Sequence, residues 1–269
     1  MIRLVGVGDN TVDTYVNLRM LFPGGNAVNV AVLAHQLGAE TGYVGWLGDD
    51  ECGELILAAL KAEGVDISHC RVFPGKATSF SSVELVDGDR VFGTSNHGVS
   101  NDFILDKEDL RYIQDFDIVH TSVYSHVEDQ LPHLKKFSAR LSFDLSNNVN
   151  LAYLERVLPF CDYAFVSLSD VQAEERVNLI ERMHALGPKM IIATCGKEGS
   201  WVFDGQQLYH QSITPVTVVD TLGAGDAYAA CFLVEITAGT TIPLAMERSA
   251  KNAAKNCLHY GAFGYGKKY

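Results

Sequence analysis

The sequence predicts an α/β fold in a single domain, with a mostly parallel sheet covered by helices on both faces. Its 269 residues suit one large α/β domain. From residue 106 onward, apolar runs typical of strands alternate with helical patterns, as a covered parallel sheet requires. Segments 77–86 and 90–95 are β-rich and flank Asp87-Gly88-Asp89, a sequence that favours a hairpin turn. Together with residues 14–22, this hairpin predicts a second, small sheet.

The first half of the chain gives two strand–helix pairs. Residues 2–7 form an apolar run that predicts the first strand. After Pro23, apolar residues recur at helical spacing from Ala27 to Leu37, and Gly38 marks the end of this helix. Residues 41–47 predict the next strand, and residues 54–63 predict the next helix.

The second half continues the alternation. The predicted strands are 117–123, 141–145, 162–166 and 189–194, and the predicted helices are 131–139 and 171–186. Residues 201–208 predict a hairpin, and the β-branched run 216–219 predicts a buried strand. Segment 227–236 is apolar without a breaker and predicts a helix. Thr241 as N-cap and Pro243 in the first turn mark the start of a last helix.

The bulk composition limits the classes of partner. Apolar residues make up 47% of the chain, enough for a large core, and the formal net charge is −12. This charge disfavours a general nucleic-acid or anionic-membrane surface, whereas a nucleotide needs only local N–H groups and cations. The six cysteines are scattered without a C-x-x-C pair, which is typical of reduced thiols. No apolar run approaches a membrane span or a signal peptide. We therefore expect a cytoplasmic protein that binds neither nucleic acid nor membrane.

The stretch Asp220-Thr221-Leu222-Gly223-Ala224-Gly225-Asp226 carries the strongest functional signal. It joins the predicted strand at 216–219 to the helix at 227–236. A helix start presents unpaired N–H groups that bind anions, phosphate above all, and glycines allow a ligand to approach closely. Asp226 at the rim of such a site can accept the proton of an attacking hydroxyl. For a glycine turn alone, the alternative is that Asp226 merely caps the helix.

This stretch resembles the D-T-x-G-A-G-D signature of the ribokinase-like (phosphofructokinase B) carbohydrate kinases. The resemblance implies that Asp226 is the catalytic base and that Gly223, Ala224 and Gly225 form the anion hole. It also implies a ribokinase-like three-layer α/β sandwich, as one kinase domain over residues 1–269. A small β-sheet lid, formed by segments of approximately 12–22 and 72–98, would cover the sugar and exclude water.

The acceptor sugar is expected near the end of the first strand. This strand ends in Gly6-x-Gly8-Asp9-Asn10-x-x-Asp13. Thr11 stands where a dinucleotide fingerprint needs its third glycine, which disfavours a nicotinamide oxidoreductase. Carboxylates at this position suit a polyol, because each can accept two hydroxyl hydrogen bonds. The family resemblance implies that Asp13 binds sugar hydroxyls, and Asp9 is either a second contact or a turn or cap residue.

A second glycine pair supports the same resemblance. Gly24-Gly25-Asn26-Ala27-Val28-Asn29 resembles the G-G-x-x-x-N motif of the family. This implies that Gly24, Gly25 and Asn29 bind the sugar, with Asn26 as a further candidate. The alternative is a glycine-rich helix entry with Asn29 on the surface. Arg90 in the predicted hairpin is a candidate sugar or anion contact, or an ordinary surface arginine.

The nucleotide is expected at another strand end. Thr194-Cys195-Gly196-Lys197-Glu198-Gly199 follows a predicted strand and resembles the T-x-G-x-x-G loop of the family. This implies that Thr194, Gly196 and Gly199 bind ATP, and the alternative is a plain turn into the next hairpin. Relatives flank adenine with the last helix, which makes Asn252 a candidate neighbour of the base.

Metal ligands are expected from the resemblance alone. The family's N-x-x-E motif, which lies near the phosphates and Mg²⁺, aligns with residues 167–170, where only the acid of Asp170 remains. We therefore expect Mg²⁺ to enter with ATP near Asp170. Asp220 is a candidate for holding a monovalent cation such as K⁺ beside the anion hole.

Taken together, these features predict an ATP-dependent sugar kinase that phosphorylates a primary hydroxyl. The strings G-D-N-x-V-D, G-G-N-A-V-N-V-A-V and W-x-G-D-D are most similar to those of fructoselysine 6-kinases. This implies a sugar or fructosamine substrate and, as in the wider family, a homodimer through the lid. Another ribokinase-like activity (fructokinase, ribokinase or nucleoside kinase) is the nearest alternative. A catalytically silent sugar sensor on the same fold is a further alternative, which the retained Asp226 and glycine turn disfavour.

Overall fold

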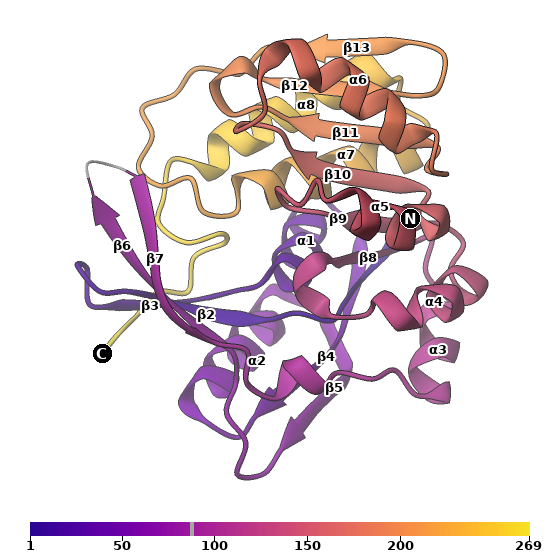
Figure 1. Cartoon of the computed structure of the whole chain (residues 1–269). Coiled ribbons are helices and arrows are strands. Elements are labelled where there is room, and N and C mark those ends of the chain that lie inside the picture. The colour runs from indigo at the N-terminus through magenta and orange to yellow at the C-terminus, as the bar shows by residue number, and fades with distance from the viewer. Residues whose placement is uncertain (87–88) are drawn as a thin grey trace.

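A computed structural model describes residues 1–86 and 89–269, without the side chains of residues 85–92. Within these residues, a sheet in the order β13-β12-β11-β10-β9-β8-β1-β4-β5 forms the centre of the molecule (Figure 1). Strands β11 to β5 of this order are parallel, and β12 and β13 extend the edge in antiparallel fashion. Its strands are β1 (Arg3–Val7), β4 (Glu40–Gly48), β5 (Asp66–Phe73), β8 (Ile118–Ser122), β9 (Leu141–Asp144), β10 (Tyr163–Ser167), β11 (Met190–Thr194), β12 (Ser200–Phe203) and β13 (Leu208–Gln211).

Helices cover both faces of this sheet. One face carries α1 (Asn26–Gln36), α2 (Glu51–Glu63), α7 (Ala224–Thr237) and α8 (Ile242–Asn256). The other face carries α3 (Lys107–Ile113), α4 (Leu131–Phe137), α5 (Leu151–Val157) and α6 (Ala173–His184). Short 3-10 turns complete the connections: η1 (Gly98–Asp102), η2 (Val123–Ser125), η3 (Glu128–Gln130), η4 (Leu158–Phe160) and η5 (Gly196–Glu198). The layers confirm the predicted three-layer sandwich.

The central strands are apolar on both faces, as a doubly covered parallel sheet requires. In β1, Leu4 packs into the core under α1 and α7, whereas Val5 and Val7 pack into the core under α3 to α6. All three side chains are fully buried. Successive side chains of a strand point to opposite faces, so one short strand contributes to both cores.

A smaller sheet lies beside the large one, on the left in Figure 1. Its order is β14-β3-β2-β6-β7, and only the β2–β6 pair among these neighbours is parallel. The strands are β2 (Thr11–Tyr15), β3 (Met20–Gly24), β6 (Phe80–Val86), β7 (Asp89–Asn96) and β14 (Lys267–Lys268). The predicted small sheet is therefore present, with the antiparallel pairing of β6 and β7 that a hairpin requires. The turn residues Asp87 and Gly88 lie outside the described residues.

One predicted element is wrong. Residues 216–219 form no strand, and Val218 and Val219 are 51% and 40% exposed. This segment crosses from the antiparallel edge of the sheet to α7, and the backbone N–H of Val219 bonds to the carbonyl of Cys257 (2.8 Å). β-branched residues favour strands only where a neighbouring strand and a covering layer receive them. Separately, no helix within the described residues is long and apolar enough to cross a membrane.

Candidate active site

The candidate site lies where the strand order reverses. β1 pairs with β4 on one side and with β8 on the other, and the chain visits β4 before it returns to β8. In open α/β sheets, the carboxyl ends of the strands at such a switch point form a crevice that binds ligands. Asp9, Ser122 and Asp144 lie at the carboxyl ends of β1, β8 and β9.

Asp9 anchors the start of α1 to this crevice. Its carboxylate accepts the backbone N–H groups of Asn26 (2.6 Å) and Ala27 (3.3 Å). It also accepts the hydroxyls of Ser122 and Ser125, each at 2.8 Å, and Asp9 is only 6% exposed. The structure thus shows the capping role that the sequence left open for Asp9, and a sugar contact by Asp9 stays a prediction.

Gly25 lets α1 begin in direct contact with the loop between β1 and β2. Its φ is 105°, and a Cβ on Gly25 would lie 2.5 Å from Cα of Asn10. Both facts exclude a larger residue, because L-residues rarely adopt this φ and the space is filled. The tight contact places the side chains of the first turn of α1 at the crevice.

Asn26 connects the carboxylates of the site. Its amide nitrogen Nδ2 donates to Oδ2 of Asp144 (3.0 Å) and to Oδ1 of Asp226 (2.8 Å). Its amide oxygen faces Nε2 of His120 at 2.9 Å. Both amide protons and the amide oxygen are therefore used, and Asn26 holds two carboxylates from distant parts of the chain at a fixed separation.

His120 fixes the orientation of that amide. It is fully buried, and burial lowers the pKa of its imidazole to about 3, so the ring is neutral. Since the oxygen of Asn26 is only an acceptor, Nε2 of His120 carries the proton and donates. Nδ1 then accepts the hydroxyl of Ser142 at 2.9 Å. This buried chain makes the nitrogen of Asn26 face the carboxylates.

Asp226 lies in the first turn of α7 and is held from two sides. Asn26 donates to Oδ1, and Nδ2 of Asn29 donates to Oδ2 at 2.6 Å. Asn29 belongs to the same first turns of α1 and is 4% exposed. The expected surface position of Asn29, given as the alternative above, is wrong because Asn29 lies in the crevice.

Asp13 and Gly24 adjoin Asn29. A Cβ on Gly24 would lie 2.8 Å from Oδ2 of Asp13 and 3.6 Å from Oδ1 of Asn29. These polar atoms therefore surround a position that only glycine leaves free. Oδ1 of Asn29 is a buried acceptor with no hydrogen-bond partner among the described residues. Such an atom is suited to a ligand hydroxyl, because an unpaired buried acceptor is otherwise costly.

The neighbouring carboxylates perturb Asp144. Burial and the negative charge of Asp226 raise the pKa of Asp144 to about 7, against the hydrogen bonds from Ser146 and Asn26. The backbone N–H of Ser146 donates to Oδ1 of Asp144 at 2.7 Å. A strongly perturbed carboxyl in a crevice is typical of a functional site.

The glycine turn forms an open helix start, as predicted. Gly223 is the N-cap of α7 with φ 74°, and a Cβ there would lie 2.5 Å from Cβ of Ala262. A Cβ on Gly225 would meet no heavy atom of the described chain within 4 Å. The N–H groups of Gly225 and Asp226 lie in the first turn, where helix amides can bind an anion, whereas the N–H of Ala224 donates to the carbonyl of Thr221 (3.2 Å).

Asp220 braces the loop that leads into this turn. Its carboxylate accepts the hydroxyl of Tyr15 and the backbone N–H groups of Leu222 (3.0 Å) and Gly261 (3.1 Å). It is 1% exposed. These contacts tie β2 and the C-terminal loop to the segment before α7, and a cation at Asp220 stays a prediction.

The predicted nucleotide loop lies at the carboxyl ends of β10 and β11. Ser167 and Thr194 are register partners at these ends. Gly196 and Gly199 have φ values of 54° and 90°, and a Cβ on Gly199 would lie 2.1 Å from the carbonyl oxygen of Gln211. The loop therefore depends on its glycines for its shape.

An ion pair fixes this loop to α6. The guanidinium of Arg176 donates two hydrogen bonds to Glu198, at 2.7 and 2.8 Å. Asp170 follows β10 and is exposed, on the same edge of the sheet as the loop.

Asn252 of α8 donates to the carbonyl of Ala227 (2.8 Å). This bond joins α8 to the first turn of α7.

Sequence reasoning missed the supporting residues of the site. Ser122, Ser125 and the hydrogen-bonded His120 were not predicted, and the side chain of Arg90 lies outside the described residues. The signal was the polar run His-Thr-Ser at the end of an otherwise apolar strand. Burying polar side chains is costly unless they are hydrogen-bonded, and His120 and Ser122 of this run are.

Known proteins resemble this chain throughout. The model of the "pfkB family carbohydrate kinase" family matches residues 1–264. The fructosamine kinase FrlD of Bacillus subtilis is 41% identical, with 99% of this chain and 95% of that protein covered. The fructoselysine 6-kinase of Escherichia coli K12 is 40% identical, with 98% and 100% covered.

Solved structures show the same fold. The ribokinase of Arabidopsis thaliana, solved with ribose and ATP, superposes with a TM-score of 0.84 at 23% identity, with 98% and 95% of the two chains covered. A ribokinase II of E. coli, solved with ATP and Mg²⁺, gives a TM-score of 0.83 at 21% identity, with 98% and 95% covered.

Proposed function

The chain belongs to the pfkB family of carbohydrate kinases, and we propose that it transfers the γ-phosphate of ATP to the 6-hydroxyl of a fructosamine such as fructoselysine. The ATP-dependent sugar kinase activity follows from the family. The fructosamine substrate is supported by the two relatives that share about two-fifths of their residues with this chain over nearly its full length. The observation that carries the proposal is the Asp226 carboxylate at an open helix start, aimed by two amide side chains.

In this proposal, Asp226 accepts the proton of the attacking hydroxyl. Asn26 and Asn29 each donate to one of its oxygens, which fixes the carboxylate in the crevice. The proton moves to Asp226 as the oxygen–phosphorus bond forms and the bond to the ADP oxygen breaks. A fixed base near the acceptor supplies proximity as well as proton transfer.

The amides at the start of α7 stabilise the group in transit. The N–H groups of Gly225 and Asp226 lie in the first turn of α7, where a phosphoryl group would come within their reach. Gly225 leaves this space open. Phosphoryl transfer depends mainly on positioning and on such electrostatic stabilisation.

The sugar is held on the opposite side of Asp226. The buried acceptor Oδ1 of Asn29 and the carboxylate of Asp13 both face the position beside Gly24. Acceptors of this kind bind the hydroxyl groups of a polyol. The primary hydroxyl would then lie at Asp226, with the remaining hydroxyls between Asn29 and Asp13.

The nucleotide would extend from the anion hole to the loop 194–199. Val218 and Val219 are exposed beside the turn, and they offer an apolar surface for a purine. Asn252 lies on α8 against the first turn of α7, where it donates to the carbonyl of Ala227. Thr194, Gly196 and Gly199 then face the phosphates and ribose.

Mg²⁺ fits this site as an ion that arrives with ATP. Among the described residues, no three His, Cys, Asp or Glu side chains cluster as a metal site. Mg²⁺ usually keeps several waters and binds through phosphates and one or two carboxylates, and the exposed Asp170 is such a carboxylate. Bound Mg²⁺ would neutralise phosphate charge.

We also propose a monovalent cation such as K⁺ near Asp220, a homodimer through the small sheet as a lid, and a cytoplasmic location. The six free thiols support the location.

The test is an ATP-consumption screen over fructosamines, fructose, ribose and nucleosides, with Asp226→Asn as the inactive control. We expect the highest kcat/KM for a fructosamine and a phosphate ester at its 6-position by NMR. A higher kcat/KM for ribose or a nucleoside would overturn the substrate. Equal ADP release by Asp226→Asn would overturn the role of Asp226.

A further inference from the structure

The small sheet carries a row of residues that leads away from the acceptor site. Asp13 of β2 pairs in register with Ser81 of β6, and Ser81 pairs with Ser95 of β7. Register partners in a sheet point to the same face. Neighbouring strands lie about 4.8 Å apart, so this row extends about 10 Å from Asp13 to Ser95.

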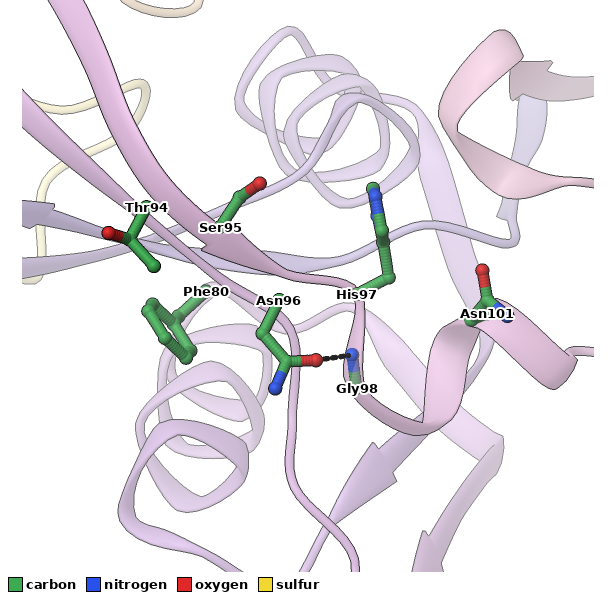
Figure 2. A pocket seen from close by; sticks show the side chains of 7 residues that line it. All are labelled: Phe80, Thr94, Ser95, Asn96, His97, Gly98 and Asn101. Atoms are coloured by element: carbon green, nitrogen blue, oxygen red, sulfur yellow. Dashed lines mark hydrogen bonds between the residues drawn. The ribbon is translucent and has the colours of Figure 1, made fainter.

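His97 continues this face at the end of β7. Figure 2 shows the side chains of Ser95 and His97 on one side of the ribbon, whereas those of Phe80 and Asn96 lie on the other. The ring of His97 meets the ring of His126 edge-on, with centroids 5.4 Å apart. His126 directly follows Ser125, whose hydroxyl binds the carboxylate of Asp9. The histidine pair therefore joins the small sheet to the crevice of the large one.

A cavity of about 510 Å³ opens at this point. Its lining comes from the end of β7 and from η1, with Phe80 of β6: Phe80, Thr94, Ser95, Asn96, His97, Gly98 and Asn101 (Figure 2). This volume lies in the range of ligand pockets, which is about 300–1,000 Å³. Ser95 and His97 line the cavity from the face of the Asp13 row, whereas Phe80 and Asn96 line it from the opposite face of the small sheet, and Asp226 is not part of the lining.

We propose that this cavity and the His97–His126 pair bind the amino-acid part of the fructosamine, and that they select substrates with a free carboxylate. The proposal rests on the proposed function. With the 6-hydroxyl at Asp226, the amine on C1 is the far end of the sugar. The chain from C6 to the amine nitrogen contains six single bonds, as many as the backbone of two residues, and extends about 7 Å. The amine therefore passes Asp13, and the attached amino acid enters the cavity.

The polar groups of the cavity suit a carboxylate. Imidazole and amide N–H groups donate to carboxylate oxygens. The oxygen Oδ1 of Asn96 already accepts the backbone N–H of Gly98 at 2.8 Å, so the amide nitrogen is what Asn96 offers. His97, His126 and Asn101 are exposed and present further nitrogen donors. No carboxylate lines this cavity among the described residues.

The test compares two fructosamines that differ only in the carboxylate and ammonium. Fructoselysine carries both, and 1-deoxy-1-pentylamino-fructose has the sugar and amine with a plain alkyl chain of the same length. His97→Leu keeps a side chain of similar size but removes the ring nitrogens. His133→Leu, on an exposed position of α4, is the matched control. We expect His97→Leu to lower the ratio of kcat/KM for fructoselysine to that for the pentyl analogue about tenfold. The loss should appear in KM, since a hydrogen bond to a charged group contributes about that factor.

Each outcome decides one question. An unchanged ratio in both His97→Leu and Asn101→Ala would overturn the subsite, even if fructoselysine is phosphorylated well. An equal loss for both substrates would overturn it also, because the effect would then be on the sugar site or on folding. If the wild-type enzyme phosphorylates fructose but neither fructosamine, the proposed function fails and the subsite with it.

Discussion

Asn26 is the residue whose replacement tests the site most sharply. Its amide nitrogen donates to Asp144 and Asp226, and its oxygen accepts from His120. Asn26→Ala removes all three bonds and little volume. Asn26→Asp keeps the shape and the acceptor for His120, but it replaces two donors with an acidic group. The two variants therefore separate shape from hydrogen-bond donation.

The expected magnitudes follow from these bonds. A hydrogen bond to a charged group contributes about 1.5–3 kcal/mol, and a buried N–H left unpaired costs about 1–3 kcal/mol. Because bonds in one network are not additive, we expect Asn26→Ala to lower the free energy of unfolding by about 3–5 kcal/mol. In Asn26→Asp the new carboxyl, buried beside Asp144 and Asp226, has a folded-state pKa above its unfolded value of about 3.9. The free energy of unfolding of Asn26→Asp therefore falls as pH rises, by up to about 1.4 kcal/mol per pH unit.

Urea unfolding at pH 6 and pH 8, followed by circular dichroism, measures both effects. We expect Asn26→Asp to lose more stability than Asn26→Ala between these pH values, and both to lower kcat at least about a hundredfold, because Asp226 is no longer held. Asn178→Asp, exposed on α6, controls for the added charge. Wild-type stability and turnover of Asn26→Asp at pH 8 would refute the bridging role of Asn26.

Three further predictions concern the carboxylates and the anion hole. Asp226→Asn keeps the fold but lowers kcat about 10²–10⁴-fold in a coupled ATP assay, the range of a general base; near-wild-type turnover contradicts this. The pKa of Asp144 is raised to about 7, so its contribution to stability is present below about pH 4 and is lost as pH rises through 7. Urea titrations from pH 4 to 8 should show this loss in the wild type and a smaller one in Asp144→Asn, and equal slopes would refute it. Gly225→Ala raises the melting temperature, because alanine favours the helix by about 0.5–1 kcal/mol and meets no atom, yet it lowers kcat by filling the anion hole; unchanged kcat contradicts an anion at this turn.

The local signals of the sequence predicted most of the fold. The alternation of strands and helices after residue 106 became the parallel strands β8 to β11 with their helices, and the helix at 227–236 became α7. The glycine turn at Gly223 was predictable because its positive φ and its close contact with Ala262 both need glycine. These features depend on a few adjacent residues, and local reasoning is sufficient for them.

The valine run 216–219 shows where local reasoning fails. Its β-branched residues have the propensity of a strand, but the sheet order ends at β13 and the run crosses to α7 instead. Strand propensity reflects packing against neighbours that the sequence does not reveal. Val218 and Val219 therefore stay exposed ahead of the start of α7 instead of entering the core.

The partners of the site residues were beyond sequence reasoning for the same reason. The carboxylate of Asp9 is bound by Ser122 and Ser125, more than a hundred positions away, and Asn26 meets Asp226 two hundred positions away. A carboxylate beside a strand end is compatible with a cap or with a ligand contact. Only the folded arrangement shows that Asp9 has four donors and acts on α1.

The neutral character of Asn26 has a consequence for catalysis. Asp9, Asp144 and Asp226 bring three carboxylates to one crevice. A lysine at position 26 would neutralise them, but a full positive charge beside Asp226 would stabilise its carboxylate and weaken it as a base. An amide donates to both carboxylates without that charge, and the buried, neutral His120 keeps the amide in this orientation. In the proposed mechanism, this arrangement holds Asp226 in place and keeps a full positive charge away from the carboxylate that accepts the proton of the sugar hydroxyl.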